Sequence, residues 1–201
     1  MRRAPFALGC AALALAWLTL WWDGGRGFAV HMSAHMGVVA VAAPLLAWGL
    51  SGSRWDPARR FPAWFAPVPA SLVEFVAVWA WHAPSLHHAA RHSAVGAVAE
   101  QGSFLTTGLL VWLSAFSSGR TAAGVVALLL TSMHMTLLGA LLALSARALY
   151  PACGGGASAL ADQHLGGAVM LLVGGVSYLA GGLWLTAGLL RASPLDDARR
   201  A

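Results

Sequence analysis

The sequence predicts an all-α, polytopic membrane protein with six transmembrane helices. Hydrophobic residues make up 59% of its 201 residues and charged residues only 9%, whereas soluble domains average about 25% charged residues. A helix needs roughly 20 residues to cross the hydrocarbon layer of a membrane. Six apolar runs approach or exceed this length: residues 5–22, 28–50, 67–84, 94–116, 122–146 and 165–190. No polar stretch is long enough for a second domain, so we expect residues 1–201 to form a single integral membrane domain.

Each predicted helix is bounded by turn residues. Asp23 opens a glycine turn after the first helix, which we expect to be retained because no convincing signal-peptide cleavage site precedes it. The loop from Ser51 to Pro69 contains four prolines, and Pro84 ends or kinks the third helix. Residues 117–120 form a tight turn before the fifth helix, and a glycine-rich loop at 151–161 precedes the sixth.

The twelve basic residues are all arginines, and their distribution predicts the orientation in the membrane. With the N-terminus in the cytoplasm, the inner loops and tails hold nine arginines and the outer loops hold three. The inner ones are Arg2, Arg3, Arg54, Arg59, Arg60, Arg120, Arg191, Arg199 and Arg200, and the outer ones are Arg26, Arg91 and Arg147. This asymmetry follows the positive-inside rule and predicts a multi-pass membrane protein with both termini in the cytoplasm. Because the arginines form no patch, they do not indicate a nucleic-acid partner.

All eight histidines are predicted to lie at the outer membrane face, which is opposite to the termini, or in the outer half of the bilayer. They are His31, His35, His82, His87, His88, His92, His134 and His164. His31 and His35 share one helix face, and Met32 and Met36 repeat their spacing on an adjacent face. Imidazole suits Cu, Fe and Zn, and thioether selects Cu(I). The pattern predicts a metal or haem site, with interfacial histidines and lipid-facing methionines as the alternative.

His134 lies about twelve residues into the fifth predicted helix, where a polar side chain is costly and usually faces the bundle interior or a wet cavity. Its neighbours Met133 and Met135 point about 100° to either side, so one or both could flank such a cavity. We predict that His134 is a ligand. The alternative is a core histidine that is hydrogen-bonded to Thr131 or Ser132.

Two glutamates are predicted at membrane depth. Glu74 precedes His82 by two turns on the third helix, and Glu100 lies about two turns into the fourth. Burial of an unpaired carboxylate is prohibitive, so we expect protonation or a partner, which would be histidine or metal. For Glu100 the alternative is hydration close to the membrane surface.

Polar residues near the predicted helix ends support predictions of exposure and helix capping. His87, His88 and His92 fall at the water boundary, and we expect them to be exposed. Asp162 is expected to be the N-cap of the sixth helix, and it could also orient His164 as a carboxylate partner.

Glycines recur every seven residues on one face of the sixth helix, at Gly167, Gly174, Gly181 and Gly188. Small residues let transmembrane backbones approach closely, and we expect this face to pack within the chain, with a homodimer interface as the alternative. The sequence contains no phosphate-binding glycine loop, GxSxG or HExxH motif. We therefore expect a protein that is not an enzyme.

Four ordered stretches resemble the CtaG-type cytochrome c oxidase assembly factors, polytopic bacterial membrane proteins linked to copper insertion into haem–copper oxidases. They are His-Met-Ser-Ala-His-Met at 31–36, Trp-His-Ala-Pro-Ser-Leu at 81–86, Gly-Ala-Leu-Leu at 139–142 with Leu-Tyr-Pro at 149–151, and Asp-Gln-His-Leu-Gly-Gly at 162–167. The resemblance implies a core site that contains His31, His35, His82 and Glu100. The chain departs from the family pattern at His164, where glutamine is usual, and at Gln101, where histidine is usual.

Together these observations predict an assembly factor that holds or delivers copper at the periplasmic side, with the catalytic subunit of a haem–copper oxidase as its partner. The predicted ligands are His31, His35 and His134, with His82 and His164 as further ligands or gates. Additional candidates are Met36, Met133, Met135, Glu74, Glu100 and Asp162. One alternative is a membrane electron carrier that binds haem b through two histidines. The other is a scaffold that docks on the oxidase without metal.

Overall fold

The computed structural model describes residues 1–23, 27–117, 119–150 and 157–191, which form helices and no strand. Two continuous helical rods each consist of three segments. The 28–50 rod contains α2 (Phe28–Met36), η1 (Gly37–Ala42) and α3 (Ala43–Leu50), and the 157–191 rod contains α9 (Ala157–Val169), η3 (Met170–Gly174) and α10 (Gly175–Arg191). The other helices are α1 (Arg3–Asp23), α4 (Pro57–Arg60), α5 (Pro67–Trp81), α6 (Pro84–Arg91), α7 (Ala94–Ala115) and α8 (Thr121–Ala143).

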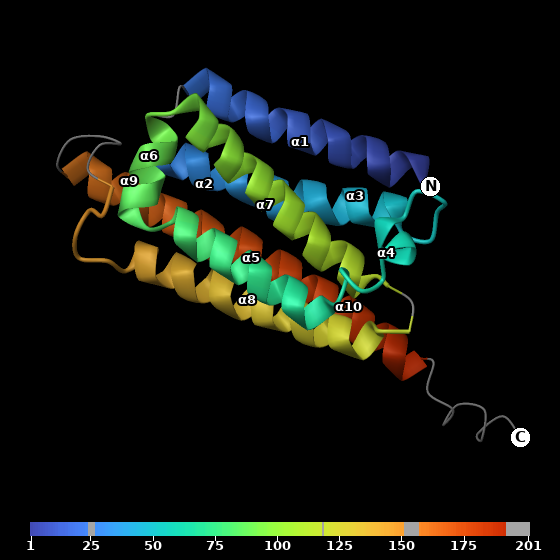
Figure 1. Cartoon of the computed structure of the whole chain (residues 1–201). Coiled ribbons are helices and arrows are strands. Elements are labelled where there is room, and N and C mark those ends of the chain that lie inside the picture. The colour runs from blue at the N-terminus through green and yellow to red at the C-terminus, as the bar shows by residue number, and fades with distance from the viewer. Residues whose placement is uncertain (24–26, 118, 151–156, 192–201) are drawn as a thin grey trace, which may run out of the picture.

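Within the described residues, five helices are long and apolar enough to cross a membrane, which confirms the predicted helical membrane fold. They are Arg3–Trp22, Phe28–Leu50, Ala94–Ala115, Thr121–Ala143 and Ser158–Arg191. α5 is apolar but has only 15 residues, so it measures about 22 Å against a hydrocarbon layer of about 30 Å. It still runs through the bundle beside α7 and α8, and α1 begins at the end of the bundle where α10 ends (Figure 1). A sixth full crossing remains a prediction.

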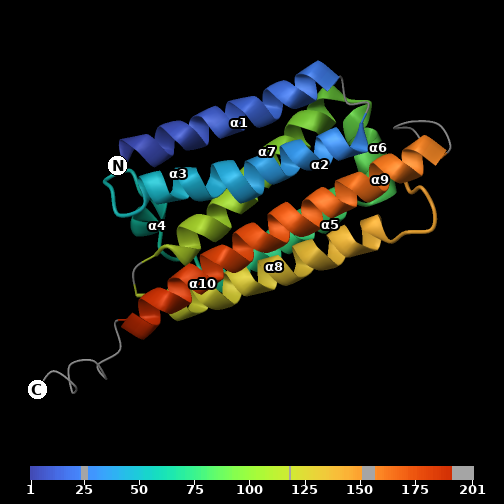
Figure 2. The ribbon, with the colours of Figure 1, turned by 180° about the vertical axis from the view of Figure 1, so that it is seen from behind.

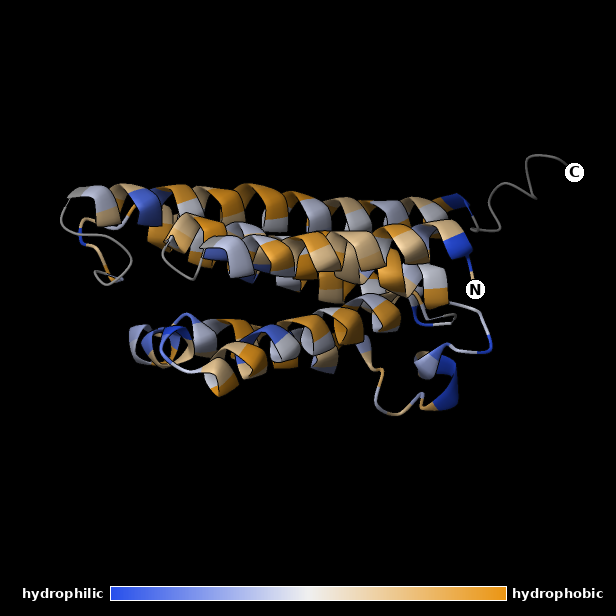
Figure 3. Ribbon diagram, turned by 90° about the horizontal axis from the view of Figure 1, so that it is seen from above, coloured by the Kyte–Doolittle hydropathy of each residue, from blue (hydrophilic) through white to orange (hydrophobic). Residues whose placement is uncertain are grey.

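The 28–50 rod occupies the middle of the bundle. It packs against α1 on one side and against α7 and α9 on the other, while α8 packs against α5 and the 157–191 rod (Figures 1 and 2). α6 lies across one end, between the end of α5 and the start of α7, and α4 lies at the other. We call these the α6 end and the α4 end. Apolar residues predominate in the middle of the long helices, and the most hydrophilic segments lie at the two ends of the bundle (Figure 3).

The described arginines are divided unequally between these ends. Arg91 and Arg147 belong to the α6 end, where Arg91 is the last residue of α6 and Arg147 lies in the loop after α8. Those at the α4 end are Arg2, Arg3, Arg54, Arg59, Arg60, Arg120 and Arg191. Arg26, Arg199 and Arg200 lie outside the described residues. The division agrees with the distribution from which we predict cytoplasmic termini, an orientation that stays a prediction.

The last helix begins at Ala157, well before the predicted start at residue 165. Asp162 is therefore inside α9, and the prediction that it caps its own helix is wrong. Its carboxylate accepts hydrogen bonds from the backbone N–H groups of Phe28 at 2.6 Å and Ala29 at 3.2 Å. These groups belong to the unsatisfied first turn of α2. Asp162 thus caps a neighbouring helix, which a pattern read along one segment cannot reveal.

Both rods contain a π-helical segment, and such a segment can leave a backbone carbonyl without its helical partner. A membrane interior offers no water for that carbonyl, and polar side chains supply the bonds. Trp112 Nε1 donates to Val39 O at 3.0 Å, and Ser177 Oγ donates to Ala40 O at 2.7 Å. Near the second segment, Ser132 Oγ donates to the Gly175 carbonyl at 2.9 Å. These bonds fix the middle of each rod to its neighbours.

The glycine face of the 157–191 rod is occupied within the chain. A Cβ on Gly167 would overlap the backbone nitrogen of Ala143, one on Gly174 would lie 3.0 Å from Met36 Sδ, and one on Gly181 would lie 2.7 Å from the Trp112 ring. The preferred expectation of intrachain packing is confirmed for these three. Because their surface is covered by α7, α8 and the 28–50 rod, the alternative of a homodimer through this face is wrong for them.

We predict that Gly167→Leu lowers the midpoint of thermal unfolding in detergent, because the new side chain would force the α9 and α8 backbones apart at about 1–3 kcal/mol or more. Gly188→Leu is the matched control, since no atom lies within 4 Å of the Cβ that it would add on the same rod. Differential scanning fluorimetry measures both. Equal midpoints for the two variants would contradict the close approach of α8 and α9.

Candidate metal centre

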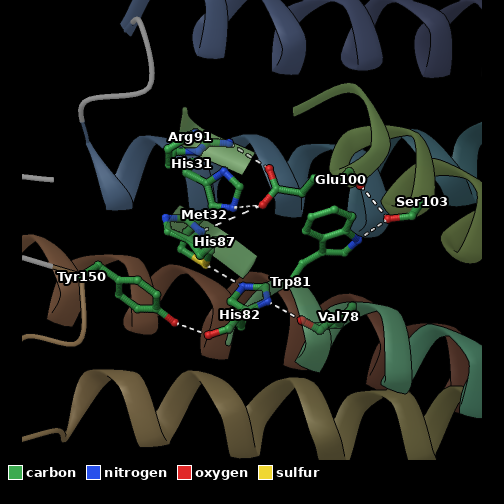
Figure 4. Close-up of polar contacts among 10 residues, drawn as sticks. All are labelled: His31, Met32, Val78, Trp81, His82, His87, Arg91, Glu100, Ser103 and Tyr150. Carbon is green, nitrogen blue, oxygen red and sulfur yellow. Dashed lines mark hydrogen bonds and ion pairs between the residues drawn. The ribbon is translucent and has the colours of Figure 1, made fainter. Parts of the chain in front are cut away.

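Three buried side chains from three helices converge at the α6 end. They are His31 of α2, His87 of α6 and Glu100 of α7, and one ligand atom from each lies within 4.8 Å of the others. His31 Nε2 is 3.6 Å and His87 Nδ1 is 3.9 Å from Glu100 Oε1. Figure 4 shows both imidazoles facing the same carboxylate oxygen. We call these three residues the metal triad.

His87 corrects a sequence-based expectation. It is only 2% exposed, whereas His88 and His92 are exposed as expected. Pro84 stands at the start of α6 and turns the chain across the end of the bundle. In this short helix His87 and Ala90 form the buried face, and the rings of Phe28 and Tyr150 contact His87 edge-on at centroid distances of 5.5 and 4.7 Å.

Arg91 forms an ion pair with Glu100. Its Nη2 lies 2.8 Å from Glu100 Oε2, and the glutamate side chain is fully buried. The alternative of a hydrated Glu100 is therefore wrong, and its partner is an arginine that the sequence analysis did not single out. The guanidinium holds one carboxylate oxygen and leaves Oε1 to the two imidazoles. Burial, and next the charge of Arg91, lower the pKa of His87 to about 3, so its ring is neutral and carries a lone pair.

Several buried nitrogen and oxygen atoms that could bind a metal have no hydrogen-bond partner in this region. They include both ring nitrogens of His31 and of His87, and Oε1 of Glu100. Leaving one such group unsatisfied costs roughly 1–3 kcal/mol, and a metal ion would satisfy all three residues together. Donors at about 2.0–2.1 Å from a tetrahedral ion lie roughly 3.3 Å apart. Side-chain shifts on the order of 1 Å would therefore close the metal triad on an ion, so these residues fit a metal.

A nitrogen–sulfur pair lies next to the metal triad. His82 Nδ1 lies 2.6 Å from the carbonyl of Val78, so Nδ1 carries the proton, and its Nε2 faces Met32 Sδ at 3.4 Å (Figure 4). Tyr150 donates its hydroxyl proton to the His82 carbonyl at 2.6 Å and so ties this residue to the loop after α8. The pair presents an imidazole lone pair and a thioether to one point, which are donors that Cu(I) accepts.

His35 lies one turn below His31 and is fully buried, and neither of its ring nitrogens has a hydrogen-bond partner. Its ring centroid is 5.4 Å from that of His82 and 3.9 Å from that of Phe104. The Phe104 ring also lies 6.4 Å from His31 and 6.2 Å from His82. Phe104 therefore stands among the three imidazoles and gives them an apolar wall.

The structure places the other predicted ligands apart from the metal triad. His134 lines a lateral groove of about 750 Å³ between α5 and α8, with the Phe75 ring edge-on at 5.4 Å. The ring nitrogens of His134 have no hydrogen-bond partner, so the alternative of a hydrogen bond to Thr131 or Ser132 is wrong. His164 Nε2 bonds the carbonyl of Ser145 at 2.8 Å.

The methionines and Glu74 also have other neighbours. Met36 and Met135 are buried against Gly174, whereas Met133 is 67% exposed on the outside of α8. Glu74 is fully buried, and its Oε1 accepts the hydroxyl proton of Tyr178 at 2.6 Å. Its expected partner, a histidine or a metal, is thus replaced by a tyrosine.

The Asp-Gln-His stretch of α9 connects helices. Besides the bonds of Asp162 to α2, Gln163 Oε1 accepts from the Leu149 N–H at 2.6 Å, and its Nε2 lies 3.3 Å from the carbonyls of Leu142 and Arg147. The carboxylate of Asp162 is engaged by Phe28 and Ala29, and Nε2 of His164 bonds the carbonyl of Ser145. These residues hold α2, and with it His31, against the end of α8.

Comparison with known proteins identifies the family of the chain. The profile of the cytochrome c oxidase caa3 assembly factor (Caa3_CtaG) family matches residues 1–192, almost the whole chain. No curated protein and no solved structure matches it. The family match includes the helices that carry the metal triad, the His82–Met32 pair and the Asp-Gln-His stretch. The chain belongs to the cytochrome c oxidase caa3 assembly factor family.

Proposed function

We propose that this assembly factor binds copper at the α6 end and passes it to the catalytic subunit of a haem–copper oxidase on the periplasmic side. The observation that carries the proposal is the metal triad, in which two imidazoles and a carboxylate converge in the bundle without hydrogen-bond partners for the facing atoms. Burying these donors is costly, and a bound cation would compensate for it. The protein acts as a carrier and carries out no reaction of its own.

The two donor sets differ in chemical softness. The metal triad offers nitrogen and oxygen, which suit Cu(II) or Zn(II), whereas the His82–Met32 pair offers nitrogen and thioether sulfur, which suit Cu(I). The metal triad would therefore hold Cu(II), and the neighbouring His82–Met32 pair would hold Cu(I). Three ligands leave the fourth position of a tetrahedral ion open, which permits exchange with a client protein.

Arg91 makes the metal triad weaker than a structural metal site. Its guanidinium neutralises the carboxylate of Glu100 by binding Oε2, the oxygen that the imidazoles do not face. A cation at Oε1 would therefore meet a neutral pair instead of a net negative charge. This arrangement favours release, which a delivery protein requires.

We predict that the double variant His31→Ala/His87→Ala retains less than a tenth of the copper that the parent protein binds, because two of the three donors are lost. Elemental analysis of purified protein after copper loading and desalting measures this. His88→Ala is the matched control, since His88 is the exposed neighbour of His87 on α6.

Three results would contradict this proposal. Equal copper in the variant and its parent would exclude the metal triad as the binding site. A Soret band in the parent protein would favour the haem alternative. Unchanged copper in the oxidase of cells that carry the double variant would favour a scaffold without a metal role.

We also predict that Met32→Leu lowers the affinity for Cu(I) about tenfold, or about 1.4 kcal/mol, while Zn(II) binding stays unchanged. The thioether facing His82 is lost, but the metal triad is intact. Anaerobic competition with a chromophoric Cu(I) chelator measures the affinity. Met133→Leu, at an exposed methionine, should have no effect, and an equal loss in both variants would refute a specific role of Met32.

A further inference from the structure

A second cavity lies at the α4 end, on the opposite side of the molecule from the metal triad. It has a volume of about 540 Å³. Three guanidinium groups line it, from Arg2 before α1, Arg59 on α4 and Arg120 before α8, and two tryptophans, Trp48 and Trp184, stand at its wall. We call this the arginine cavity.

The arginine cavity carries unbalanced positive charge. Throughout the described parts of the chain, ion pairs involve only Glu100, so none of the three guanidinium groups has a carboxylate partner there. They donate instead to carbonyls: Arg2 to Trp48 at 3.5 Å, Arg59 to Gly52 at 3.0 Å, and Arg120 to Pro62 at 2.9 Å and Phe65 at 3.1 Å.

One acidic side chain, Asp56, also lines the cavity, but its oxygens are engaged by the backbone. Oδ2 accepts from the Gly52 N–H at 2.8 Å and Oδ1 from the Ala58 N–H at 3.0 Å. Each guanidinium offers five N–H groups, of which the carbonyls use only one or two. The remaining donors and the surplus charge match an anion with several oxygens, such as a phosphate ester.

An apolar groove of about 460 Å³ continues from the arginine cavity along the shaft of the bundle. Trp48, Phe116 and Trp184 line both spaces, so the two are contiguous. The rest of the groove is formed by the 28–50 rod and α10 and has a nearly pure hydrocarbon surface, which comes from Ala40, Val41, Pro44, Leu45, Ala180 and Gly181. Val41 and Trp184 are 40% and 60% exposed, so the groove opens sideways toward the space that lipid chains occupy.

We propose that the arginine cavity and this groove together bind one anionic phospholipid. Its phosphate headgroup pairs with Arg2, Arg59 and Arg120, and an acyl chain lies in the groove. Basic pockets between transmembrane helices are a known way to hold anionic headgroups, and tryptophans favour the boundary between headgroups and hydrocarbon. The apolar groove selects a lipid over a soluble phosphate, and the unbalanced arginines select an anionic lipid over a zwitterionic one.

The test uses the purified full-length chain and native mass spectrometry. Phosphatidylglycerol and phosphatidylcholine with identical acyl chains are the two lipid probes, and glycerol phosphate is the soluble headgroup probe. We expect at least tenfold more protein with bound phosphatidylglycerol than with phosphatidylcholine at equal lipid concentration, and no retained glycerol phosphate. Equal binding of the two lipids would overturn the proposal, and so would retention of glycerol phosphate at the level of the anionic lipid.

Two matched double variants locate the site. Arg2→Gln/Arg59→Gln removes two cavity arginines but leaves the bonds of Arg120 to the carbonyls of Pro62 and Phe65. Arg54→Gln/Arg60→Gln removes the same charge from the same end, at arginines that lie over Trp55 and Phe61 outside the cavity. We expect the first to lose the preference for phosphatidylglycerol and the second to keep it. An equal loss in both would mean general surface attraction and would overturn the proposal.

A third variant tests the groove. Ala180→Trp places a large ring in the groove at an exposed position, so it should reduce the binding of phosphatidylglycerol at least fivefold without lowering the unfolding midpoint of lipid-free protein. Undiminished lipid binding would contradict the assignment of the acyl chain to this groove. None of these measurements depends on copper, so the metal proposal and the lipid proposal can fail separately.

Discussion

Inside a membrane no water is present to satisfy a polar group, so each such group in the bundle must find its partner within the chain or bind a ligand. The fold follows this constraint closely. Carbonyls at the π-helical segments receive protons from Trp112, Ser177 and Ser132, and the open first turn of α2 receives the carboxylate of Asp162. Where the constraint is met by such bonds, the structure is locked. The imidazoles of His31 and His87 and Oε1 of Glu100 have no such bonds, and it is there that we propose a bound metal ion.

The electrostatics of that site depend on the pair of Arg91 and Glu100. A buried ion pair is costly to form and more costly to break, and this one links α6 to α7 while leaving one carboxylate oxygen without a hydrogen-bond partner. The geometry favours moderate affinity over tight retention, because the arginine cancels the charge that would otherwise attract a cation. Such a balance suits the metal delivery that we propose.

Sequence patterns predicted part of the candidate site. His31, His82 and Glu100 share the region that the family resemblance implied, and His35 lies one turn deeper. His87 was missed because a histidine between two helices looks like an exposed loop residue, and only the fold of α6 across the end of the bundle buries it. The signal that could have found it is the spacing of His87 and Arg91 on one helix face, directly before a helix that carries a buried glutamate. His134 has the right depth, but it faces the groove between α5 and α8.

The sequence by itself determined the helical membrane class, the positions of the long helices and the concentration of arginines on one side. These properties depend on local hydrophobicity and charge, which each segment carries wherever it packs. The tertiary structure alone decided which polar groups meet: that Asp162 caps α2, that Arg91 holds Glu100, that Tyr178 bonds Glu74 and that the glycine face is occupied within the chain. The physical reason is that all of these contacts except the local link of Arg91 to Glu100 join residues distant in sequence. Helix periodicity gives the face of a residue on its own helix, but not which neighbour that face meets.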